Sequence, residues 1–151
     1  MNRKAFTLIE ILVVTAIIMI VTGTGIAGYR RFNQKQILQT AAAELKSNLN
    51  LARSWAMAPR KSYCKKIDKP LSGYEVEIMN NFYEIYEVCD DASSSSSLIE
   101  TFNFPDALNG VANEAFLFQV LNGAVSNEVA ITLGLDDMSE KIIIKTNGQI
   151  E

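Results

Sequence analysis

The sequence places one acidic residue inside an otherwise uncharged apolar segment. Arg3 and Lys4 come first, Glu10 follows, and the 19 residues from Ile11 to Tyr29 carry no charge. As a helix, this segment would extend roughly 28 Å, close to the thickness of the hydrocarbon core of a bilayer. A carboxylate is costly in such a segment, so its expected chemistry is ion pairing with a cation that meets it there.

Few other residues could support catalysis or metal binding. The chain has no histidine and only two cysteines, which removes the commonest general base and argues against a zinc site. Asp90-Asp91 and Asp136-Asp137 are acidic pairs in loops. A calcium site needs about six to eight oxygen ligands, and neither loop resembles an EF-hand. The sequence therefore predicts no enzyme, no cofactor and no metal, with calcium at these loops the remaining question.

The two cysteines, Cys64 and Cys89, allow a single pairing. If this part of the chain is exported, a disulfide is the natural interpretation. It would close a loop of about 25 residues and stabilise the fold by roughly 3 kcal/mol in the chain-entropy model. The alternative is two buried free thiols.

Charge divides the chain into a basic and an acidic part. Residues 1–66 carry eleven Lys and Arg and two acids, a net +9, and residues 67–151 carry three Lys and fifteen acids, a net −12, which sum to −3. The length suits one modest domain in addition to the apolar segment. An acidic domain argues against a general nucleic-acid-binding surface.

Glycines interrupt the apolar segment at Gly23, Gly25 and Gly28. Their G-x-G-x-x-G spacing is not a dinucleotide fingerprint, because that motif needs a strand before it and a helix opening after it. Each glycine weakens a helix by about 1 kcal/mol relative to alanine. We therefore expect a soft point where the helix can bend or locally melt.

From Arg30 the pattern becomes amphipathic, and the helix is expected to end near Ala58-Pro59. Its apolar stripe recurs at three- and four-residue spacing through Leu38, Ala41, Ala42, Leu45, Leu49, Ala52 and Trp55 or Ala56. This narrow stripe is expected to pack on a sheet of the same chain, with coiled-coil pairing as the alternative.

Short strands separated by turn residues are expected in the remainder, at 74–78, 82–89, 98–104, 115–121, 129–133 and 141–146. The serine run 93–97 is expected to be a mobile polar loop. The basic run 60–69 is interpreted as a solvated connector, or alternatively as a patch for a polyanion or an acidic neighbouring subunit. The predicted fold class is α+β, one long helix packed on a mainly antiparallel sheet.

The residues Arg3-Lys4-Ala5-Phe6-Thr7-Leu8-Ile9-Glu10 resemble the processing site of type IV pilins and type II secretion pseudopilins. The resemblance implies that a prepilin peptidase cuts between Ala5 and Phe6 and methylates the new amino terminus. Ala5 stands where the family usually has glycine. Glu10, fifth in the mature chain, would pair with the terminal amine of a neighbouring subunit. The alternative is an ordinary secretory signal, cut near Ala27-Gly28, or a plain anchor helix.

This pilin resemblance implies a domain plan and a set of partners. Residues 1–5 would be a leader, 6–29 a transmembrane and filament-core helix, 30–58 its amphipathic half, and 59–151 a β-rich head. The head would lie outside the cytoplasm, beyond a bacterial inner membrane. The expected partners are the peptidase, other pilin or pseudopilin subunits and the inner-membrane assembly platform.

A narrower resemblance is carried by Ala52-Arg53-Ser54-Trp55-Ala56, by 118–123, which matches an F-x-x-x-G hairpin with one extra residue, and by the terminal Gly148-Gln149-Ile150. These are similar to the H-type minor pseudopilins and their type IV counterparts (GspH/FimT-like), which implies a structural role in a secretion pseudopilus or a pilus. Some members bind DNA through C-terminal arginines. The tail here has none, so nucleic acid is not an expected partner. The alternative function remains a type IV minor pilin that binds DNA in natural transformation.

Overall fold

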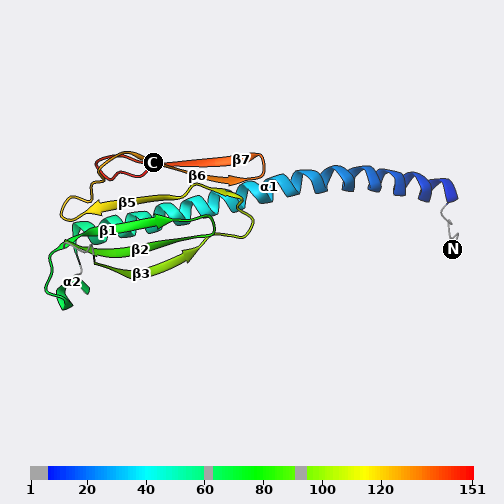
Figure 1. Cartoon of the computed structure of the whole chain (residues 1–151). Helices are drawn as coiled ribbons and strands as arrows, with labels where there is room; N and C mark the ends of the chain where they lie inside the picture. Colours follow the sequence, from blue (N-terminus) through cyan, green and yellow to red (C-terminus); the bar gives the residue numbers. More distant parts are fainter. Residues whose placement is uncertain (1–6, 60–62, 91–94) are drawn as a thin grey trace. The chain divides into compact units, whose positions relative to one another are not determined.

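The structure, a computed structural model, describes residues 7–59, 63–90 and 95–151, with the backbone alone at 24–27. The chain forms two compact units, Met1–Gln36 and Ile37–Glu151. Helix α1, Leu8–Met57, contributes its first part to one unit and its second part to the other (Figure 1).

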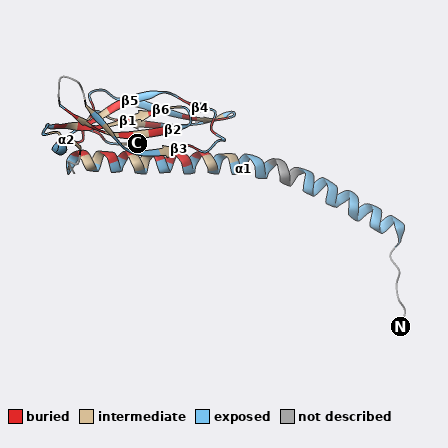
Figure 2. Ribbon diagram, turned by 60° about the horizontal axis from the view of Figure 1, so that its bottom comes forward, coloured by how far each residue is buried: buried red, intermediate tan, exposed pale blue. Residues whose placement is uncertain are grey.

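Thr7 directly precedes helix α1, and its carbonyl oxygen accepts hydrogen bonds from the Glu10 and Ile11 amides at 3.1 and 3.3 Å. It ends before Pro59, because the residue preceding a proline is biased away from helical geometry. The described side chains of the first unit are almost all exposed, whereas the second part of α1 buries one side (Figure 2).

A four-stranded antiparallel sheet has the strand order β3-β2-β1-β5. Its strands are β1 Leu71–Ile78, β2 Phe82–Cys89, β3 Ser96–Asn103 and β5 Glu114–Gln119. The β1–β2 turn at Asn80-Asn81 is closed by the Met79 amide, which donates to the Phe82 carbonyl at 2.9 Å.

A second, three-stranded sheet has the order β4-β6-β7 and is also antiparallel. Figure 1 shows its strands β6 and β7 side by side. Its strands are β4 Gly110–Val111, β6 Val129–Leu135 and β7 Met138–Ile144. The β6–β7 turn places Asp136 at a positive φ of 51°, a conformation that aspartate tolerates better than most residues. The expectation of a single sheet is therefore replaced by two.

One hydrophobic cluster joins the second part of α1 to both sheets. The predicted helix stripe is buried, and so are alternating residues of the strands, including Tyr74, Val76, Ile78, Ile131, Leu133, Ile142 and Ile144. The Trp55 and Tyr74 rings lie 5.9 Å apart between helix and sheet. This arrangement confirms the predicted α+β fold, a long helix packed on antiparallel β-structure in a pilin-like arrangement.

The serine run differs from the prediction of a mobile loop. Residues 91–94 lie outside the described part of the chain, but Ser96 and Ser97 belong to β3 and pair with Val88 and Glu87. The Ser95 carbonyl accepts a hydrogen bond from the Cys89 amide at 2.9 Å. A ladder needs only backbone groups, so polar composition did not prevent a strand here.

The basic run contains a short helix, α2, Tyr63–Lys66. Residues 60–62 lie outside the described part of the chain. Lys65 and Lys66 are exposed, as a solvated connector requires, but Cys64 of the same short helix is fully buried.

Candidate processing and assembly site

Of the residues predicted for processing and assembly, Glu10 is described, whereas Ala5 and Phe6 lie outside the described part of the chain. Glu10 is in the first turn of α1 and is exposed. Its neighbours Leu8 and Ile9 are 82% and 70% exposed. The carboxylate therefore lies at the start of α1, in the part of the helix whose described apolar side chains are exposed.

The helix dipole favours a negative charge at Glu10, but no described cation pairs with it. The positive end of the helix dipole favours an anion in the first turn. Across 7–59, 63–90 and 95–151, no cation forms an ion pair with Glu10. In an apolar medium the carboxylate needs a cation to offset its desolvation, and the described residues do not supply one.

Among the described residues, α1 is the one helix whose length and composition would allow it to cross a membrane. Its most apolar 18-residue window has a mean hydropathy of 2.3, and none of that window is buried by the protein. Lipid or other apolar helices would provide the missing cover.

A second cluster lies where α1 approaches its end, around Arg53. The Arg53 Nη2 donates to the Asn147 carbonyl at 3.2 Å. Gly123 and Gly148 face the same side chain with positive φ values of 61° and 77°. A Cβ on Gly123 would lie 2.8 Å from Arg53 Cγ, and one on Gly148 would lie 1.9 Å from the Gly123 carbonyl oxygen. Both positions therefore require glycine for space and for backbone conformation.

This Arg53 cluster brings together three stretches that lie far apart in the sequence. They are the Ala52–Ala56 end of α1, the turn at 120–123 and the C-terminal turn at 147–149. The Leu121 amide also donates to the Ala56 carbonyl at 3.0 Å. The segments that carry the narrower sequence resemblance thus form one packed junction.

The predicted cysteine pair is joined in the structure. Cys64 of α2 and Cys89 of β2 form a disulfide with a Cα–Cα distance of 5.6 Å. Glu87, two residues before Cys89 on the same face of β2, is 1% exposed. Its carboxylate accepts hydrogen bonds from the Tyr63 amide at 3.2 Å and the Cys64 amide at 3.1 Å. A covalent bond and a carboxyl group that accepts two amide hydrogen bonds therefore fasten α2 to the sheet.

The outer face of the four-stranded sheet is acidic. Glu77 of β1 lies directly opposite Glu84 of β2, and Glu75 lies opposite Tyr86. The Tyr86 hydroxyl donates to Glu84 at 2.6 Å, and Thr101 donates to the other oxygen of the same carboxylate at 2.9 Å. The hydrogen bond to Glu84, with burial and the nearby negative charges, raises the pKa of Tyr86 to about 12. This face suits a cationic partner rather than a nucleic acid.

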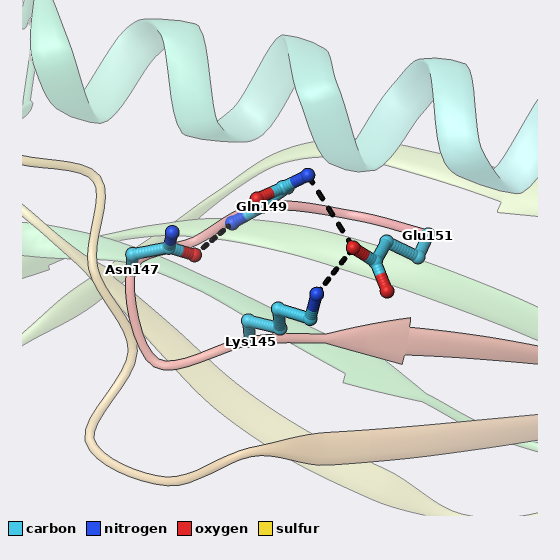
Figure 3. A network of polar contacts seen from close by, with 4 residues as sticks. All are labelled: Lys145, Asn147, Gln149 and Glu151. Atoms are coloured by element: carbon cyan, nitrogen blue, oxygen red, sulfur yellow. Dashed lines mark hydrogen bonds and ion pairs between the residues drawn. The ribbon is translucent and has the colours of Figure 1, made fainter.

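The C-terminal tail pairs with the end of β7 (Figure 3). The Ile143 and Glu151 backbones exchange hydrogen bonds at 3.1 and 2.9 Å. Lys145 forms an ion pair with the Glu151 carboxylate, which also accepts a hydrogen bond from Gln149 at 3.4 Å. The charge of Lys145 is therefore compensated by an acid of the tail itself.

Sequence reasoning missed Glu87 and underestimated Arg53. Side chains alternate between the two faces of a strand, so Glu87 lies on the same buried face as Ile85 and Cys89. This alternation was a sequence signal that the Glu87 carboxylate is buried. The role of Arg53 had no such local signal, because its partners Gly123 and Gly148 are distant in sequence.

Comparison with known proteins adds one match. Residues 1–26 match the family model of the prokaryotic N-terminal methylation motif. Searches of curated proteins and of solved structures found no match to the chain. The matched segment contains the charged start, Glu10 and most of the apolar part of α1. This motif indicates a type IV pilin-like or pseudopilin precursor and points to a structural role.

Proposed function

We propose that the chain is a minor pilin or pseudopilin, a structural subunit of a type II secretion pseudopilus or a type IV pilus. The observation that carries the proposal is the position of Glu10. It lies inside the methylation motif, in the first turn of an exposed apolar helix, with no cation partner from the described residues. A filament of such helices would supply both the apolar cover and the cation.

Processing provides the cation. Cleavage between Ala5 and Phe6 hydrolyses one peptide bond and leaves an ammonium group on Phe6, which methylation retains as a cation. In the filament, the Glu10 carboxylate of one subunit meets the Phe6 amine of its neighbour. Each charge is costly in an apolar medium, and their pairing offsets the two desolvation costs and sets the register between subunits. Residues 6–29 would span the inner membrane before assembly, with the head outside the cytoplasm.

A minor rather than a major subunit is supported by two features of the second unit. The junction of Arg53, Gly123 and Gly148 gives a structural reason for the stretches that resemble the H-type family. The acidic sheet face around Glu77 and Glu84 provides a surface for other subunits or for cargo. The head would use this face while the helices pack in the filament.

The Glu10 proposal is tested by replacing Glu10 with glutamine in a strain that assembles the filament. We expect Glu10→Gln to be processed normally, because the cleavage site is untouched, and to be depleted from sheared filaments. Glu44→Gln is the matched control, since Glu44 is an exposed acid on the second part of the same helix. Glu10→Gln entering filaments as efficiently as Glu44→Gln would contradict the pairing.

The cleavage site is tested independently by the amino-terminal sequence of the mature protein. The proposal requires a chain that begins at Phe6 with a methylated amine, and bulky charged residues at Ala5 and Phe6 should leave the leader attached. A mature chain beginning at Gly28 would show an ordinary secretory signal. Recovery of the active protein with its first five residues attached would exclude the proposed mechanism.

A further inference from the structure

Three cations lie within six residues directly after the apolar segment of α1. They are Arg30, Arg31 and Lys35, here called the basic collar, and all are exposed. No acid occurs in the sequence between Glu10 and Glu44. Among the residues that the structure describes, none of the three takes part in an ion pair. The basic collar is therefore a positive surface that the described chain does not neutralise.

Two aromatic residues accompany the collar. Tyr29 and Phe32 are 70% and 66% exposed. Successive helix residues are about 100° apart, so the two rings share one side of α1, and Arg31 and Lys35 share another. Aromatic rings and long basic side chains both favour the headgroup layer, where an apolar body and a polar tip are each accommodated.

The spacing along the helix matches the layers of a bilayer. From Leu8 to Gly28 the helix rises about 30 Å, the thickness of the hydrocarbon core. From Arg30 to Lys35 it rises about 7 Å, comparable to one headgroup layer of roughly 5–8 Å. With Leu8 at one boundary of the hydrocarbon core, the basic collar lies among the headgroups of the opposite leaflet.

We infer that the basic collar binds the phosphate groups of anionic phospholipids in the leaflet from which the head emerges. The inference rests on the proposed membrane span of residues 6–29. The planar guanidinium groups of Arg30 and Arg31 can each donate two parallel hydrogen bonds to a phosphate, and Lys35 adds a point charge. These contacts hold the helix at one depth and retain the subunit in the bilayer until it is assembled.

The experiment uses the full chain in mixed micelles with equal amounts of phosphatidylglycerol and phosphatidylcholine, with native mass spectrometry to count the lipids retained. Each collar cation should favour the anionic lipid about fivefold, and the three together on the order of a hundredfold. The triple variant R30Q/R31Q/K35Q should lose this preference. The matched control K65Q/K66Q/K69Q removes three exposed head cations and should keep it. Equal losses in both variants would overturn the inference.

Two further experiments distinguish binding of the lipid from binding of a free anion or of a second copy of the chain. Inorganic phosphate should not displace phosphatidylglycerol, because a free anion lacks the acyl chains that hold the headgroup beside the helix. Displacement would show a general anion site and overturn the inference. In phosphatidylglycerol nanodiscs, carbodiimide should not link Lys35 to Glu77 or Glu84 of a second copy. Such a link would mean that the collar meets the acidic sheet face instead.

Hydrogen exchange in the same nanodiscs distinguishes failure of this inference from failure of the membrane proposal. Protected amides between Leu8 and Gly28 without preference for the anionic lipid would remove the collar inference and leave the span. Rapid exchange throughout that segment would mean that the helix does not cross the bilayer, and both proposals would fail.

Discussion

The apolar side chains of helix α1 are exposed in the first unit and mostly buried in the second. In the first unit, Val14 is 49% exposed and Leu8 is 82% exposed, although both are aliphatic. In the second unit, Leu45 and Leu49 are fully buried by strands of the same chain. The second unit completes its own core, whereas the first presents an apolar surface that lipid or other subunits must cover. The same helix is therefore a core element in one unit and an exposed apolar surface in the other.

Acidic residues follow the same division. Glu87 in the second unit is buried, and the amides of Tyr63 and Cys64 satisfy its carboxylate within the fold. Glu10 in the first unit has no described cation partner. The Glu87 carboxylate finds its donors within its own domain, whereas the role in assembly that we propose for Glu10 depends on a cation from another subunit.

The largest expected effect concerns the buried side of α1. Leu49→Ala should lower the free energy of unfolding of the second unit by about 2–5 kcal/mol, because it leaves a cavity in the core. Leu12→Ala, at a position 57% exposed in the first unit, should change it by less than about 0.5 kcal/mol. Urea denaturation of both full-length variants in detergent measures the difference, and equal losses would abolish the distinction between the two parts of the helix.

The disulfide should have the next largest effect. Replacing Cys64 and Cys89 together by serine should lower the free energy of unfolding by about 3 kcal/mol, because the unfolded chain regains the freedom of the closed loop. Reductant should lower the stability of the natural chain and leave the double variant unchanged. Non-reducing peptide mapping of protein recovered from cells should show the Cys64–Cys89 link. Two free thiols there would show that the bond does not form in the cell.

Alkaline pH should destabilise the second unit through Tyr83. Burial raises its pKa to about 12, the Glu44 and Glu100 charges add to this, and the hydrogen bond from Asn48 opposes it. The folded state therefore holds the phenolic proton more tightly, so the contribution is complete below about pH 10 and is lost as pH rises towards 12.

The loss should be at most about 2–3 kcal/mol, measured as the free energy of unfolding against pH. Tyr83→Phe should reduce the slope of this part of the profile, and the slope that remains should be due to Tyr86, whose pKa is also raised to about 12. A Tyr83→Phe profile as steep as that of the natural chain would assign the titration to another group.

The smallest effect concerns the glycines of α1. A Cβ on Gly23 or Gly28 would meet nothing within 4 Å, so alanine should stabilise the first unit's helix by about 1 kcal/mol per site. In contrast, Gly123→Ala should destabilise the second unit, because that residue has a φ of 61°. Amide exchange of α1 in detergent measures the first change and urea denaturation measures the second. Unchanged exchange at Gly23 and Gly28 would mean that no soft point exists there.

Much of this protein followed from residue order alone. Charge, hydropathy and spacing located the apolar helix, its single acid, the amphipathic stripe and the alternation of Tyr74, Val76 and Ile78. These features are local and have the periods of a helix or a strand, so neighbouring residues are sufficient to identify them. The single cysteine pairing followed from the presence of only two cysteines.

Only the tertiary structure decided how these elements combine. The residue pattern of a strand does not specify which other strand it pairs with. The division into a four-stranded and a three-stranded sheet therefore could not be predicted. The Arg53 junction and the Glu87 hydrogen bonds depend on backbone groups brought together from distant parts of the chain. Backbone amides and carbonyls are identical in every residue, so the sequence carries no local mark of where they will meet a side chain.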